Sequence, residues 1–230
     1  MQLAEQIRRH LLSSGASLVE FADMSVTDSE VRQGLPIGIS IAIALEPAIV
    51  ADILEGPTVD YADEYEQTND LLDRLAESCA EMIRAEGYRA VAGRASDLSR
   101  LDVATLSTPL PHKTVATRAG LGWIGKCALL VTEQYGSAVR LSTVLTDASL
   151  PITEPAVRSR CGECSECVTA CPALAPDGSQ WSAGTKRGDI YDAFACFKTA
   201  KALADAKGIQ HIICGICIAA CPWTKRYLSR

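Results

Sequence analysis

Residues 161–172 read Cys-Gly-Glu-Cys-Ser-Glu-Cys-Val-Thr-Ala-Cys-Pro. Four cysteines spaced C-x2-C-x2-C-x3-C and followed by proline are typical of a run in which three thiolates bind one [4Fe-4S] cubane, while the fourth binds a neighbouring one. A second run supplies the complementary thiols at Cys196, Cys214, Cys217 and Cys221, the last again followed by proline. Eight of the ten cysteines therefore fall in the last third of the chain.

The two runs predict two clusters arranged as in bacterial ferredoxins. We assign Cys161, Cys164, Cys167 and Cys221 to the first cluster, and Cys171, Cys196, Cys214 and Cys217 to the second. A structural zinc site is disfavoured because it needs only two short ligand pairs. Disulfides are disfavoured because the chain has 10 cysteines in 230 residues and no secretion signal at its start. The motif indicates an iron–sulfur protein that carries electrons.

Charge is distributed unevenly along the chain. Residues 1–150 carry 12 Lys and Arg against 21 Asp and Glu, whereas residues 151–230 carry 10 against 7. An acidic main body argues against a nucleic-acid partner, which would need a basic face. The basic C-terminal part either docks an acidic electron donor or offsets the charge of the clusters, and both interpretations remain open. Because the most apolar stretch, 37–45, is too short to span a bilayer, we expect a soluble cytoplasmic protein without membrane contact.

Hydrophobic periodicity predicts an α+β protein. We expect an α/β body over residues 1–150 and a ferredoxin-like domain with two clusters over residues 151–230, joined at a linker that contains Pro151 and Pro155. In the body, the pattern predicts helices near 3–12 and 65–86 and strands near 17–22, 36–45 and 88–92. The strand 36–45 alternates isoleucine with small residues, which favours a central position with another element close over the small side. Cys79 lies on the apolar stripe of the second helix and is interpreted as a core thiol.

The middle of the chain contains a glycine-rich loop. A helix is expected at 111–119, followed by Gly120-Leu-Gly-Trp-Ile-Gly-Lys126, which nearly fits two nucleotide-binding motifs. Those motifs leave a strand and open a helix, whereas this loop follows a helix, so nucleotide binding is not expected. We expect strands 128–132 and 138–146 to pair as a hairpin. A further helix is predicted at 197–207, ended by Gly208.

Several segments between about residue 100 and the C-terminus form a recognisable set. They are Pro111-His-Lys-Thr-Val-Ala, the run from Arg118 to Lys126, Tyr135-Gly-Ser, Arg140-Leu, Thr146-Asp147 and the double motif ending in Cys-Pro-Trp223. With this set the chain resembles the epoxyqueuosine reductase family. The resemblance implies similarity to reductive dehalogenases, a nitroreductase-like cobalamin-processing body, and a cobalamin that has no protein ligand below cobalt and is reduced by two [4Fe-4S] clusters.

The resemblance also suggests where a cobalamin or another corrinoid would bind. The candidate contacts, taken from the matched segments and their polarity, are His112, Lys113, Gly122, Trp123, Lys126, Cys127, Tyr135, Ser137 and Arg140. Structural alternatives stay open for several of them. His112 could cap the helix after Pro111, and Trp123 and Cys127 could be core residues; Cys127 could also be a redox-active thiol.

Three departures from the family shape the functional expectation. The chain has Leu106, Ser107 and Thr108 where the family has its proton-donating aspartate, Cys127 where it has asparagine, and no helical-repeat extension after Arg230. We therefore expect an oxidoreductase of anaerobic, low-potential chemistry that reduces cobalt or a substrate reacting at cobalt, rather than epoxyqueuosine in tRNA. It would take electrons from an external donor and could serve a corrinoid protein or methyltransferase. A non-catalytic relay that docks on a partner enzyme, and a tRNA epoxyqueuosine reductase, are the alternatives.

Overall fold

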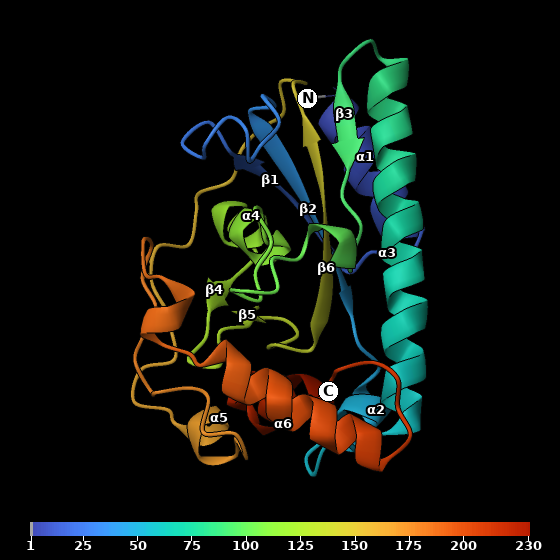
Figure 1. Cartoon of the computed structure of the whole chain (residues 1–230). Coiled ribbons are helices and arrows are strands. Elements are labelled where there is room, and N and C mark those ends of the chain that lie inside the picture. Colours follow the sequence, from blue (N-terminus) through green and yellow to red (C-terminus); the bar gives the residue numbers. More distant parts are fainter. Residues whose placement is uncertain (1) are drawn as a thin grey trace. The chain divides into compact units, whose positions relative to one another are not determined.

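The computed structural model describes residues 2–230 and confirms the α+β class (Figure 1). The helices are α1 (Gln2–Ser13), α2 (Pro47–Ala51), α3 (Val59–Ala85), α4 (His112–Arg118), α5 (Glu166–Thr169), α6 (Ala193–Ala206), α7 (Ile216–Ala220) and α8 (Pro222–Leu228). The strands are β1 (Leu18–Asp23), β2 (Ile37–Ala44), β3 (Ala90–Ala92), β4 (Trp123–Ile124), β5 (Leu130–Val131) and β6 (Val139–Thr146). Short 3-10 turns lie at Leu98–Arg100 and Arg187–Asp189.

The chain forms two compact units, each built from segments that are separate in the sequence. The first unit contains the chain up to Ala44 together with Gln67–Leu121 and Arg140–Ala156. The second contains Leu45–Glu66, Gly122–Val139 and Val157–Arg230. This division differs from a linear boundary at residue 150, because residues 45–66 and 122–139 group with the cysteine-rich part.

The first unit contains a four-stranded sheet in the order β1-β2-β6-β3. β1 pairs antiparallel with β2, and β3 pairs antiparallel with β6. The predicted central position of 36–45 is confirmed, since β2 lies between β1 and β6. The isoleucines of β2 join one hydrophobic core with α1 and the C-terminal part of α3, and this core includes the fully buried thiol of Cys79. The interpretation of Cys79 as a core residue is thereby confirmed.

The small residues of β2 allow α4 to approach the opposite face of the sheet. Helix α4 packs against β1 and β2, as Figure 1 shows. A Cβ atom added at Gly38 would lie 2.7 Å from Cγ1 of Val115 in α4. The expected close element over the small side is therefore α4, and glycine at this position makes the contact possible.

In the second unit, β4 and β5 pair with each other as an antiparallel hairpin. The predicted hairpin between 128–132 and 138–146 is wrong, because β6 belongs to the sheet of the first unit. Gly122 explains the observed pairing: a Cβ at this residue would lie 2.1 Å from the carbonyl oxygen of Val131. The glycine-rich segment thus folds back against β5, the strand that follows it. No hydrophobic periodicity in the sequence predicts this pairing.

Two helices begin earlier than the periodicity indicates. α3 starts at Val59, where the Thr58 hydroxyl accepts a hydrogen bond from the Tyr61 amide at 3.1 Å. α6 starts at Ala193, because the Asp192 carboxylate accepts from the amides of Phe194 and Ala195 at 3.0 and 2.9 Å. Polar N-caps fix both starts upstream of the apolar stripes. The predicted end of the last of these helices at Gly208 is confirmed by its left-handed backbone, φ 68°.

Candidate metal centre

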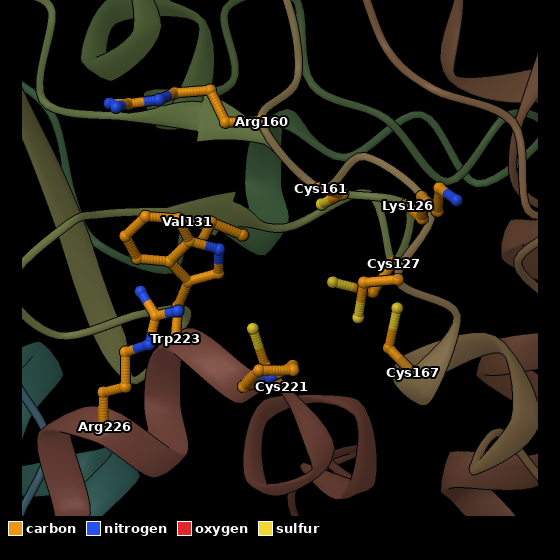
Figure 2. A pocket seen from close by; sticks show the side chains of 12 residues that line it. Lys126, Cys127, Val131, Arg160, Cys161, Cys167, Cys221, Trp223 and Arg226 are labelled. Carbon is orange, nitrogen blue, oxygen red and sulfur yellow. The ribbon is translucent and has the colours of Figure 1, made fainter.

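One cavity of the second unit is lined by sulfur. Its volume is about 240 Å³, and its walls include the thiols of Cys161, Cys164, Cys167 and Cys221 (Figure 2). A fifth thiol, that of Cys127, lines the same cavity. The remaining lining residues are Gly125, Lys126, Val131, Arg160, Pro222, Trp223 and Arg226. Four soft ligands from two distant parts of the sequence, gathered around one space, are the donor set that an iron–sulfur cubane requires.

Local backbone geometry presents these cysteines. The Cys164 amide donates to the Cys161 carbonyl at 3.1 Å, which curls the first half of the motif, and Cys167 lies in α5. Cys221 is the N-cap of α8, where Pro222 occupies the first turn without needing a donor partner. Because α5 packs against α7 and α7 against α8, the two cysteine runs meet.

The second predicted ligand set is also gathered within this unit. Cys171, Cys196 and Cys214 lie close enough for their charges to interact. Burial raises the pKa of Cys196 and of Cys214, and the neighbouring thiols act in the same direction. Cys217, in α7, lies beside Cys127, and its charge also acts on Tyr191, which contacts Cys196. Ligands held as protonated thiols release their protons when a metal binds.

Tyr191 is a further contact of the second set. Its phenol is hydrogen-bonded to Cys196. Burial, followed by this contact, raises the pKa of Tyr191 well above its ordinary value, so the phenol stays protonated and can donate to sulfur. No motif pointed to this residue, since it lies five positions before the cysteine that it contacts.

Cys127 lies between members of the two ligand sets. It is 3% exposed and is in hydrogen-bonding contact with both Cys167 and Cys217. The contact with Cys167 lowers the pKa of Cys127, but the contact with Cys217, burial and the Cys217 charge outweigh it and raise the pKa well above the ordinary value. The contact with Cys127, followed by burial, likewise raises the pKa of Cys167.

Cations and aromatic rings surround the thiol cavity. The Arg160 guanidinium lies 5.2 Å from the centre of the Trp123 ring, and that of Arg226 lies 4.7 Å from the Trp223 ring. The two tryptophans meet edge to face at 5.0 Å between ring centres. Trp123 is 2% exposed, and its Nε1 has no hydrogen-bond partner within residues 2–230. A buried indole donor left without an acceptor points to a polar group supplied from elsewhere.

The thiols are not arranged around a single ion. Within the part of the chain that the structure describes, no group of three or more His, Cys, Asp or Glu side chains converges as a mononuclear metal site would. A cubane binds each of its four cysteines through a different iron, so its ligands stand farther apart than those of one zinc ion.

Six of the nine candidate corrinoid contacts belong to the second unit, and three of these have structural roles. Gly122 allows the β4–β5 pairing. Tyr135 packs edge to face on Tyr227. Ser137 is buried, and its amide donates to the Thr224 hydroxyl at 3.1 Å. A Cβ at Gly136 would lie 2.2 Å from the Thr224 backbone nitrogen. The Tyr-Gly-Ser segment therefore holds the start of α8, next to Cys221. The other three are Trp123, Lys126 and Cys127.

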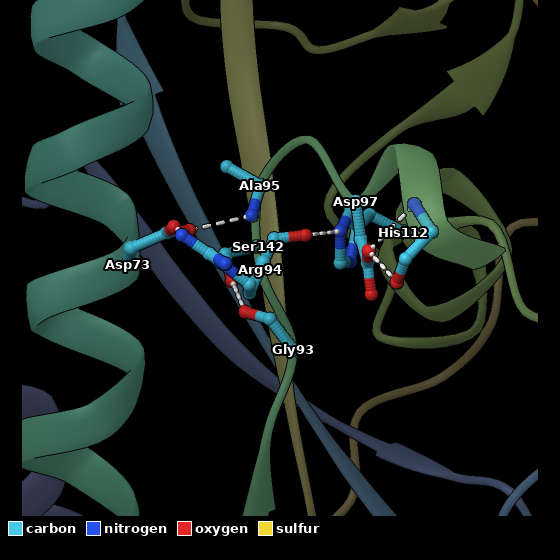
Figure 3. Close-up of polar contacts among 8 residues, drawn as sticks. Asp73, Gly93, Arg94, Ala95, Asp97, His112 and Ser142 are labelled. Carbon is cyan, nitrogen blue, oxygen red and sulfur yellow. Dashed lines mark hydrogen bonds and ion pairs between the residues drawn. The ribbon is translucent and has the colours of Figure 1, made fainter. Parts of the chain in front are cut away.

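The remaining three candidates, His112, Lys113 and Arg140, belong to the first unit. Both ring nitrogens of His112 have partners. Nδ1 lies 2.9 Å from the Thr143 hydroxyl. Nε2 lies 2.8 Å from the Arg94 carbonyl (Figure 3). Burial is the main cause that lowers the pKa of His112, which keeps the ring neutral. Arg140 donates twice to Oδ1 of Asn69, at 3.0 and 2.7 Å.

The first unit also contains a carboxylate beside the position of the missing family acid. The amide of Asp102 donates to the Ser107 carbonyl at 2.8 Å, and the residues between them form a tight loop in which Leu106 has φ 51°. Hydrogen bonds from the Thr105 hydroxyl and the Ala104 amide lower the pKa of Asp102. Sequence reasoning missed Asp102 because loop closure, rather than alignment, brings it to Ser107.

Comparison with known proteins gives consistent matches. No family model matches the chain. It is 33% identical over 143 residues to an epoxyqueuosine reductase of Gloeobacter violaceus, covering 57% of this chain and 42% of that protein. It is 51% identical over 69 residues to one of Synechococcus sp. (strain RCC307), covering 30% of this chain and 21% of that protein. The chain thus spans less than half the length of these curated relatives.

Solved structures share the fold. The catabolic reductive dehalogenase NpRdhA in complex with 3-bromo-4-hydroxybenzoic acid matches with a TM-score of 0.70 at 16% identity, over 96% of this chain and 31% of that one. An epoxyqueuosine reductase with a modified tRNA stem loop matches with a TM-score of 0.66 at 19% identity, over 97% of this chain and 66% of that one. No helix within residues 2–230 has the length and apolar character needed to cross a bilayer. The sequence matches support an epoxyqueuosine reductase-like family, and the solved structures show that the chain shares their fold.

Proposed function

We propose that the protein is an iron–sulfur redox protein with two [4Fe-4S] clusters, which reduces a corrinoid or a substrate that reacts at its cobalt. The observation that carries the first half of this proposal is the cavity lined by Cys161, Cys164, Cys167 and Cys221. The second set, Cys171, Cys196, Cys214 and Cys217, completes the ligand count for a second cubane.

When bound, the clusters would supply low-potential single-electron transfer, and the corrinoid would supply a cobalt centre that accepts it. The chain's own residues would hold the clusters through thiolates and shield them with Trp123 and Trp223. Lys126, Arg160 and Arg226 add positive charge at the cavity wall, where each electron adds negative charge. These side chains favour the reduced state, because a nearby cation stabilises an anion in a partly buried site.

Two observations support a corrinoid as the electron acceptor. A structural neighbour with a TM-score of 0.70 is a reductive dehalogenase described by a mechanism for B12-dependent dehalogenation. The unpaired Nε1 donor of Trp123, one of the matched-segment residues, would suit an amide carbonyl of a corrinoid side chain. The tryptophan is therefore the candidate contact that we consider first.

Titration of anaerobically reconstituted protein with hydroxocobalamin tests the corrinoid. We expect a saturable change in the cobalamin spectrum. Trp123→Phe should weaken binding about fivefold, the value of one neutral hydrogen bond, whereas Trp181→Phe, in the same unit, should not. If the clusters assemble but no spectral change occurs, the protein is an electron relay that docks on a partner enzyme.

Reduction of epoxyqueuosine in tRNA is a second candidate, favoured by the sequence similarity to epoxyqueuosine reductases. Asp102 is the carboxylate next to Ser107, but its lowered pKa makes it a poor proton donor. We therefore expect the chain not to restore queuosine in a reductase-deficient strain. Restoration that is lost in Asp102→Asn would assign the reaction to this chain and the proton transfer to Asp102.

A further inference from the structure

Cys127 stands apart from the eight cysteines of the two runs but is placed among them by the fold. It lies in the loop of the β4–β5 hairpin, 34 residues before Cys161. The loop is tight: the Ala128 amide donates to the Gly125 carbonyl at 2.9 Å, and the Gly125 amide donates to the Leu129 carbonyl at 2.9 Å. Ala128 has φ 58°, an uncommon conformation for a residue with a side chain. The turn therefore fixes Cys127 in one position.

The loop also brings the Cys127 sulfur close to several cysteines of the motif. A Cβ at Gly125 would lie 3.5 Å from the Cys127 sulfur and 3.6 Å from the Cys161 sulfur, so Gly125 lies beside both thiols. Cys127 lines the same cavity as the first ligand set, and Figure 2 places it beside Cys167. Its second contact is Cys217, which belongs to the other set.

The ligand count argues that Cys127 is not itself a ligand. Two cubanes need eight thiolates, and the two runs supply all eight. A ninth thiol that is buried, and that touches one ligand of each set, is a hydrogen-bond donor with two acceptors at hand. Hydrogen bonds to ligand sulfurs are one of the factors that set cluster potentials, because they stabilise the more negative reduced state.

We propose that Cys127 is a positioning residue beside the two clusters: its single S–H proton donates to one ligand sulfur at a time, that of Cys167 or that of Cys217, and raises the reduction potential of the cluster whose ligand accepts it. This inference rests on the proposed pair of clusters. Cys127 would then be a polar contact that lies between the two redox centres.

Redox titration of reconstituted Cys127→Ala and Cys127→Ser, followed by EPR, tests this role. We expect both variants to keep about eight iron and eight sulfide per chain, as the wild type does. In the alanine variant at least one cluster should be harder to reduce. At a fixed ambient potential its reduced-to-oxidised ratio should fall about tenfold, equivalent to about 59 mV for one electron. The serine variant, which keeps a donor, should titrate near the wild type.

Cys79→Ala is the matched control, because it removes the other thiol outside the motif, which is equally buried but lies in the core of the first unit. It should leave both potentials unchanged. Unchanged potentials in Cys127→Ala, a shift to easier reduction caused by water entry, or a loss of about four irons would each overturn the role of Cys127 as donor. A wild type that assembles no cubanes would instead overturn the proposed function itself.

Discussion

Cys79 and Cys127 are both buried thiols outside the cysteine motifs, yet they occupy opposite kinds of surroundings. Cys79 is surrounded by the aliphatic core of the first unit, and burial alone raises its pKa to about 12. Cys127 faces other thiols in a cavity that also contains three cationic side chains. The comparison teaches that burial does not define the role of a cysteine here, because the neighbours decide whether a thiol is inert packing or part of a redox site.

The largest difference from Cys79 is expected when a cysteine of the two motifs is replaced. Cys221→Ala should lower the iron content of the reconstituted protein from about eight to about four per chain, since one cubane loses a ligand. Cys79→Ala should keep the full content. Iron and sulfide assays give the answer, and an unchanged content in Cys221→Ala would remove that residue from the ligand set.

Glycines test the packing of the two units. Gly136→Ala places a Cβ 2.2 Å from the Thr224 backbone nitrogen, whereas Gly38→Ala places one 2.7 Å from Cγ1 of the Val115 side chain. We expect Gly136→Ala to destabilise the protein by about 3 kcal/mol, within the range for overpacking and strain, and Gly38→Ala to cost less. Thermal unfolding measures both.

Gly87→Ala serves as the control for these variants. Gly87 has φ 85° and nothing within 4 Å of an added Cβ, so only the backbone conformation is strained. Its cost should be about 1 kcal/mol. If Gly136→Ala were no worse than this control, Tyr135–Ser137 would not be what holds the start of α8.

The Cys79 thiol predicts a pH dependence in the first unit. Its folded-state pKa of about 12 exceeds that of an unfolded cysteine, so above about pH 8.5 the unfolded chain releases a proton that the folded chain keeps. The thiol's contribution to stability is therefore complete below that pH and declines as pH rises. The stability difference between wild type and Cys79→Ala should fall by up to about 1.4 kcal/mol per pH unit above pH 9; a flat difference would contradict the buried state of Cys79.

The smallest predicted effect concerns surface charge. Arg160 pairs with Glu133 while lying over Trp123, and Arg84 pairs with Glu77 at similar exposure without an aromatic ring. Arg84→Gln should cost at most about 0.5 kcal/mol, as exposed ion pairs do. Arg160→Gln should cost about 0.5 kcal/mol more, from the lost cation–π contact. If urea unfolding gives the same loss of unfolding free energy for both variants, the cation–π contact does not contribute to stability.

The regular parts of the fold were accessible from the sequence because they follow from local periods. The alternation of isoleucine and small residues in 37–44 predicted a central strand with a close neighbour, and both are observed. The caps Thr58 and Asp192 moved helix starts upstream of their apolar stripes. The pairing of β4 with β5 was missed, since it depends on Gly122 approaching the Val131 carbonyl, a contact without a sequence period.

The candidate site also has a part that the sequence predicts and a part that it does not. Motif spacing alone groups Cys161, Cys164 and Cys167 with Cys221, and these four line one cavity. The cluster assignments themselves stay predictions. The positions of Cys127, Tyr191 and Asp102 could not be predicted, because a hairpin loop, a contact before α6 and a tight turn bring them to their partners.

The central claim is that the chain binds two cubanes through its two cysteine runs. Mössbauer spectroscopy of protein reconstituted anaerobically with ⁵⁷Fe tests it most directly. We predict that essentially all bound iron appears as [4Fe-4S] clusters, with about eight iron and eight sulfide per chain. Iron bound without sulfide, or a protein that retains zinc in place of iron, would contradict the claim.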